Sequence, residues 1–228
     1  MATSHFRPEL FAFLRALKRH NDRLWFDRNR ERYETDVRAP FLRFIADIAD
    51  PLHSVSAAVV ADPRPVGGSM FRIHRDTRFS KDKSPYKTHA AAHFRHRAGR
   101  DVHAPGFYLH LEQGKVFFGA GIWHPDSQAL ATIREAILDN EALWTAATRS
   151  RAFRRACSWE GESARRVPRG VPADHPLLED LKRKDFTVFA ASSEAEACRS
   201  DFGRRFIRFC RAAAPLNELL ARALGLDW

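Results

Sequence analysis

The stretch GFYLHLEQGKVFFGAGIW, residues 106–123, carries the clearest secondary-structure signal in this 228-residue chain. Within residues 107–111, apolar side chains alternate with Tyr108 and His110, and a second run of strand-forming residues covers 116–123. Successive side chains of a β-strand point to opposite faces of the sheet. The alternation therefore predicts two strands, each with an apolar face and a more polar or smaller face.

Strand-like alternation extends N-terminally from this stretch. Residues 55–59, 70–75 and 89–95 show the same period of two, and the second of them places Arg72 and His74 on its polar face. Five short strands in succession favour a mostly antiparallel sheet. A further strand is predicted at 186–190, beyond the next group of helices.

Helical periodicity flanks the predicted strands on both sides. Apolar residues recur at helical spacing through 6–20 and 22–50, with Pro40 expected to kink or restart the second helix. The pattern returns after residue 126, with helices through 153, at 176–184, and from 201 onward, where Pro215 is expected to interrupt the last one; residues 158–175 look like loop. The fold class predicted is α+β, with C-terminal helices packed on the sheet and residues 1–228 forming one domain.

Overall composition limits the compartment and the partners. The chain has no run of eighteen apolar residues and no signal-peptide pattern at its N-terminus, so we expect a soluble, cytoplasmic protein that does not bind membranes. Cys157, Cys198 and Cys210 are widely spaced, which argues against a disulfide framework. The formal charge of +10 favours anionic partners.

Positive charge is concentrated in the middle of the chain. Residues 64–100 hold ten Lys or Arg and two Asp, a net charge of +8. Its core is FRIHRDTRFSKDKSPYK, residues 71–87. Arginine forks and lysine ammonium groups are typical ligands of phosphate oxygens, so we expect a phosphate or other anion to bind here. The candidate ligand-binding residues are Arg72, Arg75, Arg78, Lys81, Lys83, Tyr86 and Lys87, with Asp76 and Asp82 as orienting carboxylates.

The same residues support a purely structural interpretation. Asp76 can pair with Arg75 or Arg78, and Asp82 with a lysine, so that the charges pin the loop rather than bind a ligand. Both interpretations stay open at the level of sequence.

Histidines gather in the same region. Seven of the eleven, His74, His89, His93, His96, His103, His110 and His124, fall within 51 residues. Imidazole titrates near neutrality, which makes His74, His93 and His110 candidate acid or base groups. No H-E-x-x-H or H-x-H spacing is present and cations are abundant nearby, so we expect no metal site and no cofactor. Phosphate-binding P-loop, nucleophile-elbow and paired-carboxylate motifs are also absent.

Four stretches together resemble the family called domain of unknown function 2461. They are RHNDRLWFDRNRERYE at 19–34, FRIHRDTRFSKDKSPYKTHAAAHF at 71–94, GFYLHLEQGKVFFGAGIWHPDSQALATIR at 106–134 and PRGVPADHP at 168–176. The resemblance implies one family domain and no particular reaction. The positions carried over are Trp25, Phe26, Arg72, Arg75, Asp76, Arg78, Phe79, Lys81, Asp82, Lys83, Pro85, Tyr86, Lys87, Gly121, Trp123, Arg134, Gly170, His175 and Pro176. The chain has His20-Asn21 where the family often has Asn-Asn.

The leading hypothesis is a module that binds a phosphate-bearing ligand, either nucleic acid or a small phosphorylated metabolite, through residues 71–87. One alternative is an enzyme acting on a phosphorylated substrate with a histidine as acid or base. The other is a scaffold or protein-interaction domain in which the basic segment is an ion-pair latch.

Overall fold

The computed structural model describes residues 4–98 and 104–228. These residues form one six-stranded sheet in the spatial order β1-β2-β3-β4-β6-β5, in which every neighbouring pair is antiparallel. The strands are β1 (Val59–Val60), β2 (His89–His96), β3 (Gly106–Glu112), β4 (Lys115–Ile122), β5 (Ser158–Glu160) and β6 (Phe186–Ser192). The predicted α+β class with an antiparallel sheet is confirmed.

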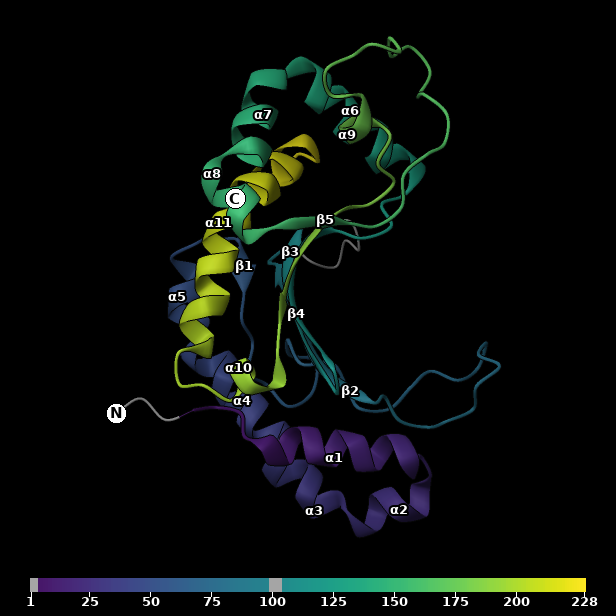
Figure 1. Cartoon of the computed structure of the whole chain (residues 1–228), viewed down its shortest axis with the longest axis vertical. Helices are drawn as coiled ribbons and strands as arrows, with labels where there is room; N and C mark the ends of the chain where they lie inside the picture. The colour runs from purple at the N-terminus through teal and green to yellow at the C-terminus, as the bar shows by residue number, and fades with distance from the viewer. Residues whose placement is uncertain (1–3, 99–103) are drawn as a thin grey trace.

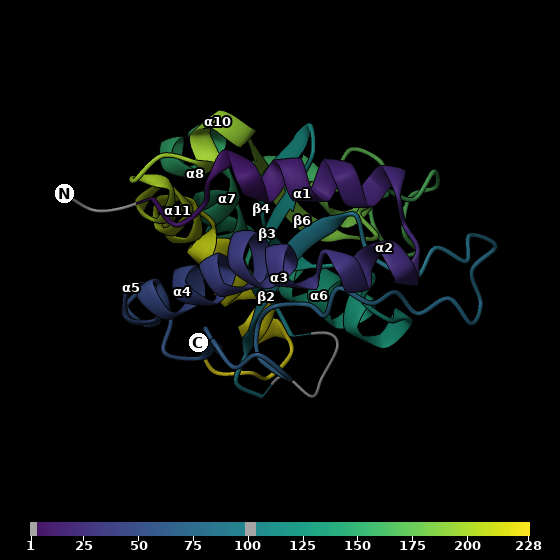
Figure 2. The same cartoon turned by 90° about the horizontal axis from the view of Figure 1, so that it is seen from below.

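Helices precede and follow the central strands. The N-terminal group is α1 (Pro8–Arg19), α2 (Arg23–Arg28), α3 (Arg30–Arg32), the π-helical turn η1 (Tyr33–Arg38), α4 (Ala39–Asp47) and α5 (Ala49–His53). The later group is α6 (Ser127–Asp139), α7 (Glu141–Arg149), α8 (Arg151–Ala156), α9 (Leu178–Leu181), α10 (Glu194–Ala197) and α11 (Phe202–Ala223). Figure 2 shows α1 running beside the row formed by α2, α3, α4 and α5. No helix within the described ranges combines the length and the apolar character needed to cross a bilayer.

One face of the sheet is buried beneath helices. Ala92, Leu109 and Phe118 lie side by side in the register of β2, β3 and β4, and all three are buried. Phe206 of α11 packs on them, with its ring centroid 5.3 Å from those of both Phe94 and Phe118. Figure 1 shows α11 lying along this face with α5, α7 and α8 grouped around it. The alternation seen in the sequence thus places its apolar set against helices.

The other face of the sheet has no described helix over it (Figure 1). His93, Tyr108, Gly119 and Phe189 are neighbours across four strands on this side, and the three with side chains are partly exposed. We call this side the open face. Its side chains of interest are His89, His93, Tyr108, His110, Glu112, Phe117 and Phe189.

Two predicted strands are wrong or shorter than expected. Residues 70–75 form no strand: Met70 makes an isolated bridge with Ala92 and His74 another with Tyr86. Residues 55–59 contribute only the start of β1, because the chain first completes the turn that follows α5. Alternation expresses a local tendency, but a strand also needs a continuous partner, and the segment leaves the edge of β2 after two residues.

The C-terminal part also corrects three expectations. The expected loop at 158–175 opens with the short strand β5, and the expected helix at 176–184 is only the four-residue α9. Helix α11 continues through Pro215 without a break. A proline in a helix interior costs about 3 kcal/mol. Buried side chains on both sides of it, including Phe206, Leu216 and Leu220, hold the helix on the core and outweigh that cost.

Candidate functional site

The 71–87 segment is a loop whose two ends are paired with each other. The Arg75 N–H donates to the Pro85 carbonyl at 2.9 Å, and the Lys87 N–H donates to the Ile73 carbonyl at 2.8 Å. Tyr86, between them, is buried, and its ring stacks on Phe26 of α2 with centroids 4.1 Å apart. The ring of Tyr86 is therefore an anchor for the loop rather than an exposed stacking surface.

Both aspartates of the loop form ion pairs within it. Asp76 accepts from the Nε and Nη2 atoms of Arg78 at 3.0 and 2.7 Å, and Asp82 pairs with Arg75. The Ser84 hydroxyl donates to the other oxygen of Asp82 at 2.6 Å. These bonds lower the pKa of Asp82, with Ser84 as the larger cause and Arg75 next. Two of the six predicted cations are thus engaged internally. Asp76 pairs with one of the two expected arginines, but the expectation that Asp82 pairs with a lysine is wrong, because its partner is Arg75.

The other four cations have no carboxylate partner among the described residues. Within residues 4–98 and 104–228, no carboxylate oxygen lies within 4.0 Å of the charged nitrogens of Arg72, Lys81, Lys83 or Lys87. Lys83 donates to the Thr77 carbonyl at 2.9 Å and Lys87 to the Arg72 carbonyl at 2.8 Å. Burial, and secondly the charge of Arg72, lowers the pKa of Lys87. The loop therefore combines an internal latch with a surplus of positive charge.

A surface cavity of about 310 Å³ brings together four residues singled out in the sequence. His74, Arg75, Pro85 and Tyr86 line it, together with Arg23 and Asp27 of α2. The cavity carries charges of both signs. Arg75 is already paired with Asp82, and Asp27 contributes a negative charge to the lining. Lys81 and Lys83 do not line it, so the predicted cations do not all converge on one cavity.

The loop is continuous with an aromatic cluster on the open face. Phe71 contacts Tyr108 with ring centroids 6.3 Å apart, and Tyr108 contacts Phe117 at 5.7 Å. The ammonium group of Lys87 lies 5.2 Å from the centre of the Phe71 ring, and that of Lys115 lies 5.3 Å from the centre of Phe117. A cation over a ring face is attracted by the ring quadrupole. A row of three rings with a lysine at each end thus runs from the base of the loop across β3 and β4.

The three predicted acid or base histidines occupy different surroundings. His74 is exposed beside Phe26 and Tyr86. Burial and then Arg95 lower the pKa of His93 to about 4, and burial lowers the pKa of His110. Neutral imidazoles are therefore favoured at both open-face positions near pH 7. Arg100 and His103 lie outside the described residues.

His110 belongs to a group that resembles a metal-ligand set. One donor atom from each of His89, His110 and Glu112 can be chosen so that all three lie within 4.8 Å of one another. The His110 Nε2 and Glu112 Oε2 atoms are 3.2 Å apart. Sequence spacing did not indicate this group, because His89 reaches the other two across strands rather than along the chain.

The sequence also did not single out the pair formed by His124 and Asp185. Asp185 is 1% exposed, and its Oδ1 accepts the His124 backbone N–H at 2.8 Å and lies 3.1 Å from His124 Nδ1. His124 has a left-handed φ of 50°, a conformation that non-glycine residues rarely adopt and that often marks functional positions. Its imidazole is 57% exposed and lies beside the buried carboxylate of Asp185. The two residues meet because Ile122 and Phe186 are paired in the sheet.

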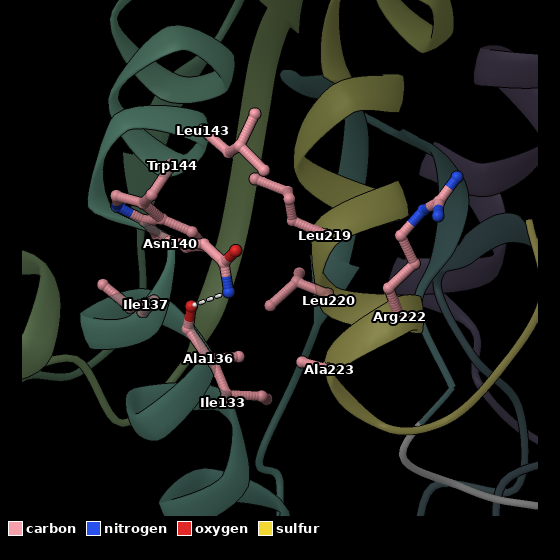
Figure 3. A pocket seen from close by; sticks show the side chains of 10 residues that line it. All are labelled: Ile133, Ala136, Ile137, Asn140, Leu143, Trp144, Leu219, Leu220, Arg222 and Ala223. Atoms are coloured by element: carbon pink, nitrogen blue, oxygen red, sulfur yellow. Dashed lines mark hydrogen bonds between the residues drawn. The ribbon is translucent and has the colours of Figure 1, made fainter.

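A second cavity of about 310 Å³ lies between α11 and the pair α6 and α7 (Figure 3). Leu143 and Leu219 point toward each other across it, and Asn140 donates to the Ala136 carbonyl at 3.1 Å. Arg222, at its rim, is paired with Glu218. This cavity is apolar and lies on the helical side of the sheet, away from the basic loop.

The resemblance suggested by the sequence is tested by comparison with known families. A family model described as "Conserved hypothetical protein (DUF2461)" matches residues 9–219. The chain belongs to the DUF2461 family. Comparison with curated proteins and with solved structures gives no significant match.

Some DUF2461 motif positions are structural and others are exposed to solvent. Among the structural ones, Gly121 has a φ of 114° and allows no side chain, and Arg134 donates to the carbonyls of Leu181 and Arg183. Others face solvent: Phe79 is 94% exposed at the tip of the basic loop and Trp123 is 69% exposed. Trp123 contacts the ring of His124 with centroids 4.1 Å apart, and the Arg78 guanidinium lies 5.7 Å from the centre of the Phe79 ring.

Proposed function

We propose that this DUF2461 protein binds a phosphate-bearing ligand, with single-stranded nucleic acid as the leading candidate, across the open face and the adjoining basic loop. One observation supports the proposal above others. Four cations without a carboxylate partner among the described residues lie on a loop that begins at a row of aromatic rings, on a sheet face that carries no described helix, and Lys87 lies over the first ring.

In this proposal the aromatic rings bind the bases of the ligand. Aromatic side chains on an exposed sheet face stack on nucleic-acid bases, and each stacked base contributes about 1–3 kcal/mol. Tyr108 and Phe117 are partly exposed on neighbouring strands, and Phe79 is fully accessible at the loop tip with Arg78 beside its ring. A ligand with several stacked bases fits this spread better than a small metabolite, which needs a concave site.

In this proposal the cations bind the phosphate groups of the ligand. Arg72, Lys81, Lys83 and Lys87 lie on the loop that begins at Phe71, and Lys87 lies over the Phe71 ring of the aromatic cluster. If these four contact phosphates, log affinity falls with log salt at a slope of about −3 for a single strand.

The test measures binding of a fluorescent 20-nucleotide single strand by anisotropy over a series of salt concentrations. The variant K81E/K83E is compared with R204E/R208E, whose arginines are exposed on α11, on the opposite side of the sheet. Each pair of changes lowers the formal charge by four, from +10 to +6. We expect K81E/K83E to reduce affinity about tenfold and to make the salt slope shallower by about 1, and we expect R204E/R208E to change both much less.

Other results would decide for the rival interpretations. If both variants lose the same affinity for the oligonucleotide, binding depends only on net charge, and the proposed site is refuted. Binding of a nucleoside monophosphate without binding of the oligonucleotide would favour the small phosphorylated ligand. If neither probe binds and K81E/K83E changes only thermal stability, the loop is a latch within a scaffold.

The proposal includes a cytoplasmic location. Cys157, Cys198 and Cys210 are all free thiols, and two of them are buried, which suits a reducing compartment. Subcellular fractionation of the untagged protein is the corresponding measurement.

Acid–base catalysis on a phosphorylated substrate is the second candidate, favoured by the His124 and Asp185 pair. The carboxylate of buried Asp185 lies 3.1 Å from Nδ1 of the exposed His124 imidazole, and a carboxylate close to an imidazole is a feature of general-base sites. We expect wild-type protein, but not H124Q, to hydrolyse bis(p-nitrophenyl) phosphate or p-nitrophenyl phosphate above background. Equal rates for H124Q would remove His124 from consideration, and no turnover of either ester would count against a phosphoesterase.

A further inference from the structure

His89, His110 and Glu112 are placed together by the register of two strands. His110 and Glu112 are two residues apart on β3, so both side chains point to the open face. His89 on β2 is paired directly with Glu112. The three positions are therefore fixed by backbone pairing rather than by a loop.

The donor atoms are close to the spacing that a metal ion needs. Zn²⁺ bound to imidazole nitrogen and carboxylate oxygen at about 2.0–2.2 Å in tetrahedral geometry places its ligand atoms about 3.3 Å apart. His110 Nε2 and Glu112 Oε2 are already 3.2 Å apart, and the rings of His89 and His110 have centroids 4.6 Å apart. With all three donors within 4.8 Å, rotation of the His89 side chain brings the set together.

Neighbouring groups orient the ligands. The Tyr108 hydroxyl lies 3.0 Å from His110 Nδ1, which leaves Nε2 directed at Glu112. Phe117 stacks on the His110 ring with centroids 4.8 Å apart, and the Thr88 hydroxyl donates to the second oxygen of Glu112 at 3.4 Å. Hydrogen bonds of this kind to ligands are characteristic of metal sites in proteins.

We propose that His89, His110 and Glu112 bind a divalent transition-metal ion of the Zn²⁺ type, with a water molecule at the fourth position. His89 and Glu112 are partly exposed although His110 is buried, so solvent reaches the group from their side. Two imidazoles and one carboxylate suit Zn²⁺, Co²⁺ or Ni²⁺ better than Mg²⁺ or Ca²⁺, which prefer oxygen. This inference stands apart from the proposed nucleic-acid binding.

Two lysines set the strength of binding. The positive charges of Lys87 and Lys115 act on His89, and Lys115 lies over the Phe117 ring next to His110. Their repulsion weakens the binding of a cation. Replacing Lys115 by alanine removes one of these charges without touching a ligand, so the proposed site gains affinity in K115A.

The experiment uses the full chain without an affinity tag, freed of metal by chelation, and the metal alone as probe. Zn²⁺ binding is measured by competition with a chromophoric chelator, and Co²⁺ binding by its visible absorption. We expect one ion per chain with an absorption band of tetrahedral intensity. We expect affinity at least tenfold weaker in H89Q and E112Q, unchanged in the matched control H93Q on the same face of β2, and about two- to fivefold tighter in K115A.

Either of two results would overturn the proposal. One is the absence of saturable binding of one ion per chain. The other is binding that H89Q and E112Q leave unchanged, or that H93Q weakens as much as they do. Thermal unfolding of each variant identifies any that fails to fold, and K115A tests the same site without altering a ligand. No oligonucleotide is needed, so this test can fail while nucleic-acid binding holds.

Discussion

The side-chain amide of Asn21 pairs with the backbone of Tyr86 as a neighbouring strand would. Its Nδ2 donates to the Tyr86 carbonyl at 2.9 Å, and its Oδ1 accepts the Tyr86 N–H at 3.0 Å. Asp22, the next residue, accepts the Trp25 N–H and caps α2. One short turn thus starts a helix and fixes the base of the basic loop, 65 residues away.

Replacing Asn21 by alanine should lower the free energy of unfolding by about 2 kcal/mol, because it leaves two backbone groups of a buried residue without partners. Chemical denaturation measures the change. The control N140A removes an exposed amide whose single bond is to its own helix, and should cost well under 1 kcal/mol. A loss for N21A no larger than that for N140A would contradict the structural role of this pair.

The ion pair between Asp82 and Arg75 should govern the local stability of the loop rather than global stability, because both partners reach solvent. In D82N we expect faster tryptic cleavage after Lys81 and Lys83 and faster exchange of the Ser84 amide hydrogen, with little change in Tm. D139N, an exposed aspartate on α6, serves as the control and should leave all three unchanged. Unaltered cleavage in D82N would argue against the latch.

His93 should make the protein less stable in acid. Its pKa falls to about 4 in the folded state, from an ordinary value of 6.5, so between these values the unfolded chain binds a proton that the folded protein does not. The stability is fully present above pH 6.5 and is lost as the pH falls toward 4, by at most about 3 kcal/mol. In H93Q, the slope of unfolding free energy against pH should be shallower over this range. The same slope in both proteins would show that His93 is not the responsible group.

Gly121 should not tolerate any side chain. A Cβ atom there would lie 1.9 Å from the Phe186 carbonyl oxygen, and its φ of 114° is unfavourable for other residues. We expect G121A to lower stability by more than about 3 kcal/mol or to prevent folding. G114A, in the turn between β3 and β4, has a similarly positive φ but nothing within 4 Å, and should cost about 1 kcal/mol. If G121A and G114A lose similar stability, the close approach of β6 is not the reason that position 121 requires glycine.

A local pattern of alternation was not enough to form a strand; a pairing partner was needed as well. The alternation in 107–111 predicted β3, and the structure places Leu109 between Ala92 and Phe118 as that pattern requires. An equally regular alternation in 70–75 formed only isolated bridges. The difference lies in the partner: β3 has a strand on each side, whereas 70–75 meets only the edge of β2 and then pairs with its own loop.

The candidate site shows the same division. The surplus of cations in 71–87 was evident in the sequence, but their partners were not, since Asp76 could have paired with either Arg75 or Arg78. Turn geometry joined it to Arg78 and left Arg75 for Asp82. His124 and Asp185, 61 residues apart, gave no local signal at all.

By itself, the sequence determined the order of helices, central strands and helices, the apolar face of β3 and β4, and the concentration of positive charge in the middle of the chain, because all of these depend on neighbouring residues. Only the tertiary structure decided which polar groups meet: Asn21 with Tyr86, His89 with Glu112, and His124 with Asp185. Such meetings depend on strand register and on long-range packing, which no local pattern specifies.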